Sequence, residues 1–188
     1  MKNTIKGTAI LVLAIAFAAF TTLKVKQVDV KESQINWIGH KVTGQHDGTI
    51  TLKSGSLEFK GQTLVGGSFV MDMTTINTTD LKGDSKGKLD GHLKSEDFFG
   101  VDKHPTATLI FTDIEKNETD YTINADLTIK DITKPVTFKM VVTEDTATAA
   151  LKIDRTKYDI KYKSASFFDD LKDKAIYNDF DLNVTLKF

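Results

Sequence analysis

Cysteine is absent from this chain of 188 residues. Its absence excludes disulfides, thiolate metal sites, cysteine nucleophiles and the acylated cysteine of a lipoprotein. An excess of positive charge is absent as well, because the formal net charge is -1. Nucleic-acid binders usually carry a strongly basic surface, so no nucleic-acid partner is expected.

Motifs of the common catalytic classes are also missing. The chain has no G-x-S-x-G elbow, no H-E-x-x-H helix and no phosphate-binding P-loop. Glu96-Asp97 and Asp169-Asp170 are adjacent carboxylates, but adjacent side chains point to different faces and form no catalytic dyad. We therefore expect no enzyme and no catalytic residue. A polar pocket with converging titratable groups around His92 would be needed to reverse this expectation.

Two histidines raise the question of a metal site. His40 and His46 flank the turn signal Thr43-Gly44 and could face each other across it. No third ligand follows at a recognisable spacing, and two histidines alone are poor evidence for zinc. The sequence thus predicts no metal and no cofactor.

The first twenty residues differ in composition from the rest of the chain. Lys2 and Lys6 precede an apolar run from Ala9 to Phe20, and small residues such as Ala16 and Ala18 offer a cleavage site. This is the pattern of a secretory signal peptide, and the run is short for a membrane span. We expect a cleaved signal peptide at 1–20 and one domain at 21–188, periplasmic or secreted. An uncleaved anchor is the alternative.

After residue 33 the dominant pattern is alternation of apolar and polar residues, which is typical of half-buried strands. Asp47-Gly48 is a turn signal, and Ser54-Gly55 indicates a bend or bulge within a strand. The pattern favours an antiparallel barrel or sandwich, and long strands kinked at glycine suit a barrel. The expected strands, about eight, are 34–42, 49–60, 63–73, 106–116, 121–129, 136–142, 147–153 and 180–188.

Two segments interrupt the strand pattern. Leu89 and Leu93 are spaced for one face of a helix, predicted over 88–95, and the aromatic pair Phe98-Phe99 follows. This segment is expected to cap one end of the sheet. A second short helix is expected within 164–174, with Ser166 as its N-cap.

Residues 90–99 (Asp-Gly-His-Leu-Lys-Ser-Glu-Asp-Phe-Phe), followed by His-Pro-Thr-Ala-Thr at 104–108, resemble the signature of the YceI-like family. Further pieces fall in the family's order: 33–40, 72–76, Thr-Lys-Pro-Val-Thr at 133–137, and Ile-Asp-Arg-Thr-Lys-Tyr at 153–158. The resemblance spans roughly Val28 to Phe188. Asp131 stands where the family usually has glycine, and the stretch Thr79 to Gly87 departs from many relatives. If polar groups of that stretch hold the head group of a ligand, a different head group is expected here.

The resemblance implies an all-β, eight-stranded antiparallel lipocalin-like barrel with one or two short helices capping its mouth. It also implies an apolar tunnel that binds a long-chain isoprenoid or similar amphiphilic lipid, in a periplasmic or secreted carrier or sequestering protein. The family is not established as enzymatic. The implied partners are the lipid and, transiently, a membrane or membrane protein; a homodimer stays open.

Inward-facing apolar side chains would line the tunnel and its lid. His92, on the capping helix, could donate to a phosphate or carbonyl head group, or could simply bond to the backbone. The expected ligand-binding residues are Trp37, Phe59, Phe69, Met71, Leu89, His92, Leu93, Phe98, Phe99, Phe111, Leu127, Phe138, Met140, Ile153, Phe168 and Leu182, with Phe167 beside them in the lid.

Two alternatives stay open at this point. The same alternation would describe a barrel filled by its own side chains, which would suit a ligand-free stress-response or structural interaction module. Arg155, the only arginine of the chain, suits either a bidentate contact with an anion or a salt bridge at a strand edge.

Overall fold

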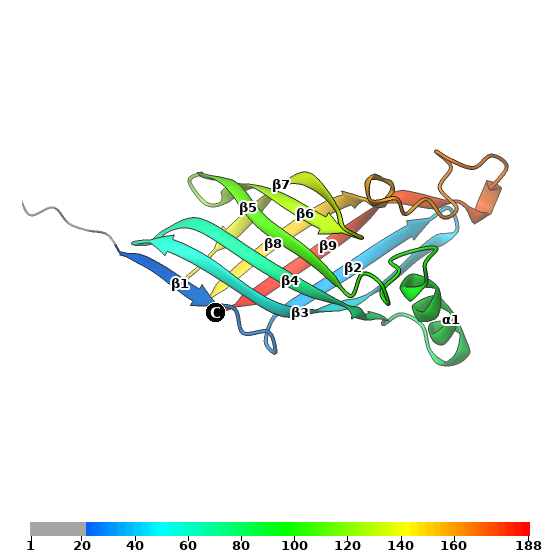
Figure 1. Ribbon diagram of the computed structural model, residues 1–188, viewed down its shortest axis with the longest axis horizontal. Helices are drawn as coiled ribbons and strands as arrows, with labels where there is room; N and C mark the ends of the chain where they lie inside the picture. Colours follow the sequence, from blue (N-terminus) through cyan, green and yellow to red (C-terminus); the bar gives the residue numbers. More distant parts are fainter. Residues whose placement is uncertain (1–21) are drawn as a thin grey trace, which may run out of the picture.

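The computed structural model describes residues 22–188, which form one antiparallel sheet that closes on itself (Figure 1). Eight strands, β2 to β9, make the ring, and pairing of β3 with β4 closes it. This confirms the predicted fold class. The strands are β1 (Leu23–Gln27), β2 (Gln34–Lys41), β3 (Gly44–Lys60), β4 (Thr63–Thr78), β5 (Thr106–Lys116), β6 (Tyr121–Ile129), β7 (Ile132–Val142), β8 (Thr146–Asp154) and β9 (Ile176–Lys187).

Strand β1 is an addition that the sequence pattern did not predict. It pairs with the second half of β3, from Leu23 opposite Lys60 to Gln27 opposite Ser56, whereas β2 pairs with the first half of the same edge. The strand is short and mostly exposed. Its sequence, Leu-Lys-Val-Lys-Gln, alternates over only four residues, and its two apolar side chains are exposed.

The predicted turn at Asp47-Gly48 is wrong, because both residues lie inside the continuous strand β3. Gly48 stands between Trp37 of β2 and Thr78 of β4. A Cβ there would lie 2.0 Å from the carbonyl oxygen of Asn77 and 2.5 Å from the Trp37 ring. This glycine makes room for the indole. The bulge expected near Ser54 is confirmed by a register shift between Leu52 and Ser54.

Helix α1 (Gly83–Lys94) begins five residues before its predicted start and packs at one end of the barrel (Figure 1). A polar cluster attaches it to the end of β4. Lys86 Nζ lies 2.7 Å from Asp90 Oδ2 and donates to the Thr78 carbonyl at 2.8 Å, while Asp90 Oδ1 accepts from the Thr78 amide at 2.8 Å. The buried side chain of Leu93 faces the core.

The second predicted helix, at 164–174, is wrong except for one short 3-10 turn, η2 (Lys172–Lys174). Asp170 and Lys172 have φ of 58° and 49°, in the left-handed region. An α-helix needs a run of right-handed residues, so these conformations break it. Another 3-10 turn, η1 (Arg155–Tyr158), follows β8, and its N-cap Asp154 accepts from the Thr156 amide.

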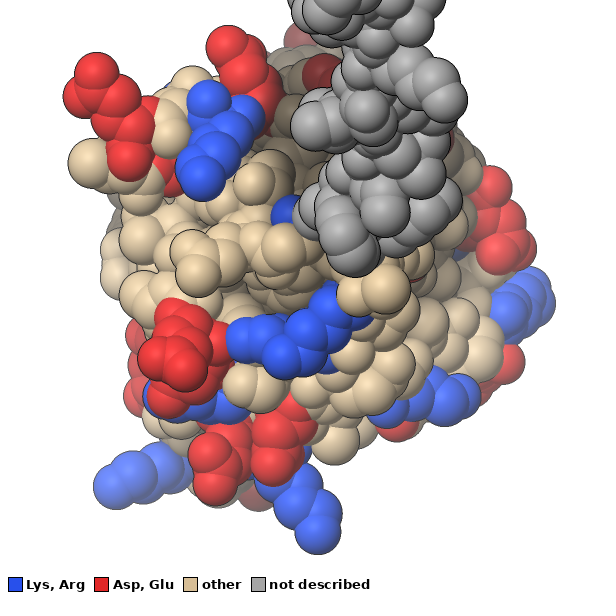
Figure 2. All heavy atoms as spheres, turned by 90° about the vertical axis from the view of Figure 1, so that its left-hand side faces the viewer, with Lys and Arg blue, Asp and Glu red and all other residues tan. Residues whose placement is uncertain are grey.

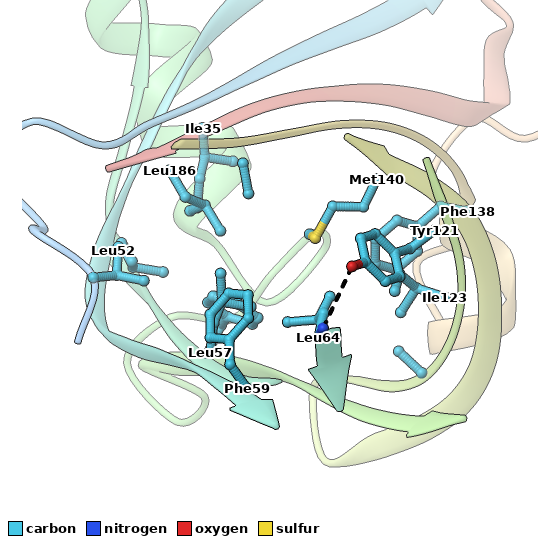
Figure 3. Close-up of a cluster of buried hydrophobic side chains, with 14 residues drawn as sticks. Ile35, Leu52, Leu57, Phe59, Leu64, Tyr121, Ile123, Phe138, Met140 and Leu186 are labelled. Atoms are coloured by element: carbon cyan, nitrogen blue, oxygen red, sulfur yellow. Dashed lines mark hydrogen bonds between the residues drawn. The ribbon is translucent and has the colours of Figure 1, made fainter. Parts of the chain in front are cut away.

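The barrel has a capped end and a hairpin end. The capped end carries α1 and residues 155–175; the hairpin end carries the turns that follow β3, β5 and β7 (Figure 1). Figure 2 shows the hairpin end, where side chains of both charges surround uncharged surface. The interior of the hairpin end is filled by packed side chains, among them Leu57, Phe59, Leu64 and Tyr121 (Figure 3). The Tyr121 hydroxyl accepts a hydrogen bond from the Leu64 amide at 3.4 Å.

Within residues 22–188, no helix has the length and apolar character needed to span a bilayer. The predicted signal peptide, residues 1–20, lies outside the described residues.

Gly48→Ala should destabilise the protein by about 2–3 kcal/mol, because its methyl group overlaps the carbonyl oxygen of Asn77, a backbone atom that shifts less easily than the end of a flexible side chain. Gly91→Ala is the matched control. Gly91 lies in α1, and a Cβ atom there would have no atom within 4 Å apart from the backbone of its own helix and its two chain neighbours. Alanine should therefore stabilise the protein by about 0.5–1 kcal/mol. Urea unfolding of both variants measures the difference. Equal stability of the two would contradict the close packing at Gly48.

Asp90→Asn should weaken the attachment of α1 and lower the free energy of unfolding by about 1–2 kcal/mol at neutral pH, because it removes the charge that pairs with Lys86. Burial raises the pKa of Asp90, but hydrogen bonds from Lys86 and Thr78 outweigh it, and the net pKa is lowered. A lowered folded-state pKa gives stability that is present above the unfolded value, about 4, and is lost as the pH falls through the folded value. The difference between wild type and variant should therefore shrink in that acidic window.

Denaturant titrations over a series of pH values measure this dependence. Asp84→Asn, in the exposed first turn of the same helix, serves as the control and should cost only a few tenths of a kcal/mol. A pH-independent loss in the Asp90 variant would refute the role of its charge.

Candidate functional site

A cavity occupies the middle of the barrel, between the packed side chains of the hairpin end and those of the capped end. The part of the cavity that the centre of a water molecule can reach has a volume of about 140 Å³. One water needs only about 10–15 Å³ by this measure, so the space is far larger than a packing defect. The barrel is therefore filled at its hairpin end and open in its middle.

Most of the residues predicted to line the tunnel do line this cavity. They reach it from β2, β4, β6, β7, β9 and the capping segment, because alternate residues of each strand point inward. Those in the wall are Trp37, Phe69, Met71, Leu93, Phe98, Phe99, Leu127, Phe138, Met140 and Leu182.

Other predicted residues lie outside the wall. Phe59 and Phe111 belong to the packed hairpin end, beyond the cavity. Ile153 is 2% exposed and, with Leu89, packs in the cluster of the capped end. These four side chains pack against other core residues and do not line the cavity. A direct contact with a ligand at these positions is not favoured by this placement.

Phe167 and Phe168, predicted as lid residues, are 49% and 50% exposed. Neither lies in the cavity wall. Lys161 Nζ stands 5.2 Å from the centre of the Phe167 ring, on the outer surface of the loop. The helix that was expected to carry these two rings is broken by the left-handed residues Asp170 and Lys172.

His92 lies at the capped end between two aromatic rings. Its ring centre is 4.3 Å from that of Tyr162 and 5.6 Å from that of Phe98. Burial lowers the pKa of His92, Asp97 raises it and Lys163 lowers it, with a net decrease. The imidazole packs α1 against the loop after η1 and stands outside the cavity wall.

The prediction missed a second group of wall residues. Its small members are Gly39, Ala107 and Ala149, whose size leaves part of the interior empty. Its larger members include Ile35, Leu52 and Leu186. The signal was present in the alternation of each strand, but an emphasis on aromatic side chains passed over the aliphatic and small ones.

The cavity reaches the surface between β2 and β9. Gly39 pairs with Phe180 and Lys41 with Ile176, so one residue of β2 faces a three-residue bulge, 177–179, of β9. Tyr177 and Asp179 are the wall residues that are also exposed. Phe98 and Phe99 are only 7% and 6% exposed, so the helical cap is shut. We call the gap at 177–179 the lateral opening.

A cluster of charges holds the strands together beside this opening. Asp181 accepts from His40 Nε2 and from Lys152 Nζ, both at 2.7 Å, and so links β2, β9 and β8. Hydrogen bonds from Lys152 and His40 lower the pKa of Asp181 against the effect of burial. His46 instead pairs with Asp80 at 2.8 Å. The two histidines thus have separate partners and do not face each other.

Arg155 lies in the cavity wall at the same opening and is 2% exposed. Its guanidinium donates to the carbonyl oxygens of Ile160 at 2.6 Å, Ile176 at 3.1 Å and Tyr177 at 3.1 Å. Burial lowers its pKa to about 10, against a smaller opposing effect of Asp154. The strand-edge salt bridge considered from the sequence does not form, since no ion pair within residues 22–188 includes Arg155.

Comparison with solved structures supports the fold. BcnA of Burkholderia cenocepacia superposes with a TM-score of 0.67 at 18% identity, covering 85% of this chain and 98% of that one. A polyisoprenoid binding domain from Saccharophagus degradans gives a TM-score of 0.58 at 14% identity, covering 88% and 99%. At these identities the likeness concerns the fold alone.

Sequence comparison finds shorter matches. The UPF0312 protein ECA1782 of Pectobacterium atrosepticum is 42% identical over 62 residues, which are 33% of this chain and 32% of that protein. Protein YceI of Escherichia coli O17:K52:H18 is 42% identical over 65 residues, 35% and 34% of the two chains. The alignments thus span about a third of each relative. The family model described as the YceI-like domain matches residues 27–188, and the chain belongs to this family.

Proposed function

We propose that this protein binds a long-chain isoprenoid or a similar amphiphilic lipid, with the apolar tail in the barrel cavity. It acts as a carrier or sequestering protein in the periplasm or outside the cell, without catalysis. The observation that carries the proposal is the unfilled cavity, whose wall is built almost wholly of aliphatic and aromatic side chains.

The energetics favour a chain-like apolar ligand. Each CH₂ group removed from water contributes about 0.8 kcal/mol, so a tail of several isoprene units has a large gross driving force. Ordering the tail and losing its translational freedom oppose binding by several kcal/mol. Because the side chains of the wall are already held in place by the strands, the protein itself loses little conformational freedom on binding, and this part of the cost is small.

The similar barrel from Saccharophagus degradans is described as polyisoprenoid binding, which supports this choice of ligand class. The titratable side chains of the wall are few, and they stand together at the lateral opening: His40, Arg155, Tyr177 and Asp179. This arrangement suits a ligand with one long apolar part and one polar end.

Native mass spectrometry of the protein from residue 21 onward, followed by organic extraction and lipid analysis, tests the proposal. A stoichiometric co-purified lipid would support it and name the ligand class. Protein that carries no lipid and takes up no added long-chain isoprenoid would contradict it, and would favour a ligand-free interaction module.

Ala149→Phe should reduce the affinity for an isoprenoid by tenfold or more, about 1.4 kcal/mol, because the added ring occupies the space of the tail. Ala150→Phe is the matched control, since Ala150 is the next residue of β8 and is exposed. Fluorescence titration with geranylgeraniol compares both variants with wild type. Equal loss of affinity in the two variants, or none in either, would place the tail elsewhere.

A further inference from the structure

We propose that Arg155 binds the anionic head group, a phosphate or a carboxylate, of the amphiphile whose tail occupies the cavity. The inference rests on the proposed function and adds to it the charge of the ligand and the position of its head.

The first support is the hydrogen-bonding capacity of the guanidinium. A guanidinium carries five N–H groups in a planar fork that matches the oxygens of a phosphate or carboxylate. Three of these groups donate to the carbonyls of Ile160, Ile176 and Tyr177. Within residues 22–188, two N–H groups have no hydrogen-bond partner, one on each terminal nitrogen. These two groups can bind two oxygens of one anion.

The second support is the charge. Arg155 is 2% exposed, and no acidic side chain in the described part of the chain forms an ion pair with it. Its neighbours are neutral carbonyls and the Phe98 ring, whose centre lies 5.5 Å from Cζ. A buried charge without a counter-ion is costly, and an arriving anion would offset that cost.

The two nearby carboxylates, Asp154 and Asp179, do not act as the counter-ion of Arg155. Asp154 Oδ1 accepts from the amide and the hydroxyl of Thr156, which turns it toward the start of η1. Asp179, at the lateral opening, is exposed, forms no ion pair with Arg155, and contributes to raising the pKa of Lys152. Arg155 is also one of the residues that line the cavity.

The third support is location. Two of the carbonyls bound by Arg155 belong to Ile176 and Tyr177, at the beginning of the bulge that makes the lateral opening. A head group at Arg155 would therefore lie near solvent while its tail extends toward Phe138 and Leu186. Away from the lateral opening the wall is apolar, so the anion must carry a tail for the whole cavity to be filled. Free phosphate would leave most of the wall uncovered.

The single arginine makes a direct test possible in the wild-type protein. Protein labelled with ¹⁵N at arginine has one Nε–H resonance, which should shift on addition of geranylgeranyl monophosphate. Geranylgeraniol and inorganic phosphate, each at the same concentration, are the two comparison ligands. A shift with the prenyl phosphate alone supports the proposal. A matching shift with inorganic phosphate would identify a free-anion site and overturn the assignment to a lipid head group.

Affinities give a second test. Wild type should bind geranylgeranyl monophosphate at least about tenfold more tightly than geranylgeraniol, the effect expected of a charge-assisted hydrogen bond. Arg155→Gln should remove that preference and retain binding of the alcohol. Lys157→Gln is the matched control, because Lys157 is an exposed cation of the same turn η1 and stands outside the cavity wall. This variant should keep the preference.

The outcomes separate this inference from the proposed function. Equal affinity of wild type for the two ligands would overturn the role of Arg155 and leave tail binding intact. Failure of both ligands to bind would overturn both. Arg155→Gln also leaves three carbonyls unpaired, so if this variant fails to fold, the wild-type resonance and the wild-type preference decide the question.

Discussion

The structure depends on the pairing of β3 on both of its edges. One edge is shared by β2 and β1, and the other pairs with β4 along most of its length. This double pairing closes the ring, so that each of the strands β2 to β9 is paired on both edges and offers no long free edge for association. Closure also creates an enclosed interior to which the strands β2 to β9 contribute alternate side chains. A cavity in the middle of the barrel follows, because small residues such as Gly39 and Ala149 face inward where larger ones would fill the space.

The two ends of the barrel are closed by different means. At the hairpin end, large side chains such as Phe59 and Leu64 pack directly against one another. At the capped end, polar contacts hold apolar elements in place: Lys86 and Asp90 attach α1 to Thr78, and Arg155 holds the bulge of β9. The second arrangement leaves a charged group in the wall beside the lateral opening. An apolar chamber with a single buried cation at its opening is well matched to a ligand with an apolar tail and an anionic end.

Much of the fold was predictable from local patterns. The alternation of Tyr121, Ile123, Ala125, Leu127 and Ile129 identified β6, and similar alternation identified most other strands. Errors arose where the tertiary structure overrides local preference. Asp47-Gly48 has the composition of a turn, yet Gly48 is a strand residue because the Trp37 indole needs its space. Residues 164–174 have the composition of a helix, yet left-handed conformations at Asp170 and Lys172 break it.

An antiparallel β protein with an apolar interior and a helical cap can be predicted from the sequence, because alternation and spacing along the chain are local properties. Only the folded barrel shows which of the inward side chains surround empty space and which fill it. That depends on residues far apart in sequence, such as Phe59 near Phe188 in the filled end and Trp37 opposite Leu182 at the cavity. It also decided the surroundings of Arg155, since its partners come from Ile160, Ile176 and Tyr177, which only the closed barrel brings together.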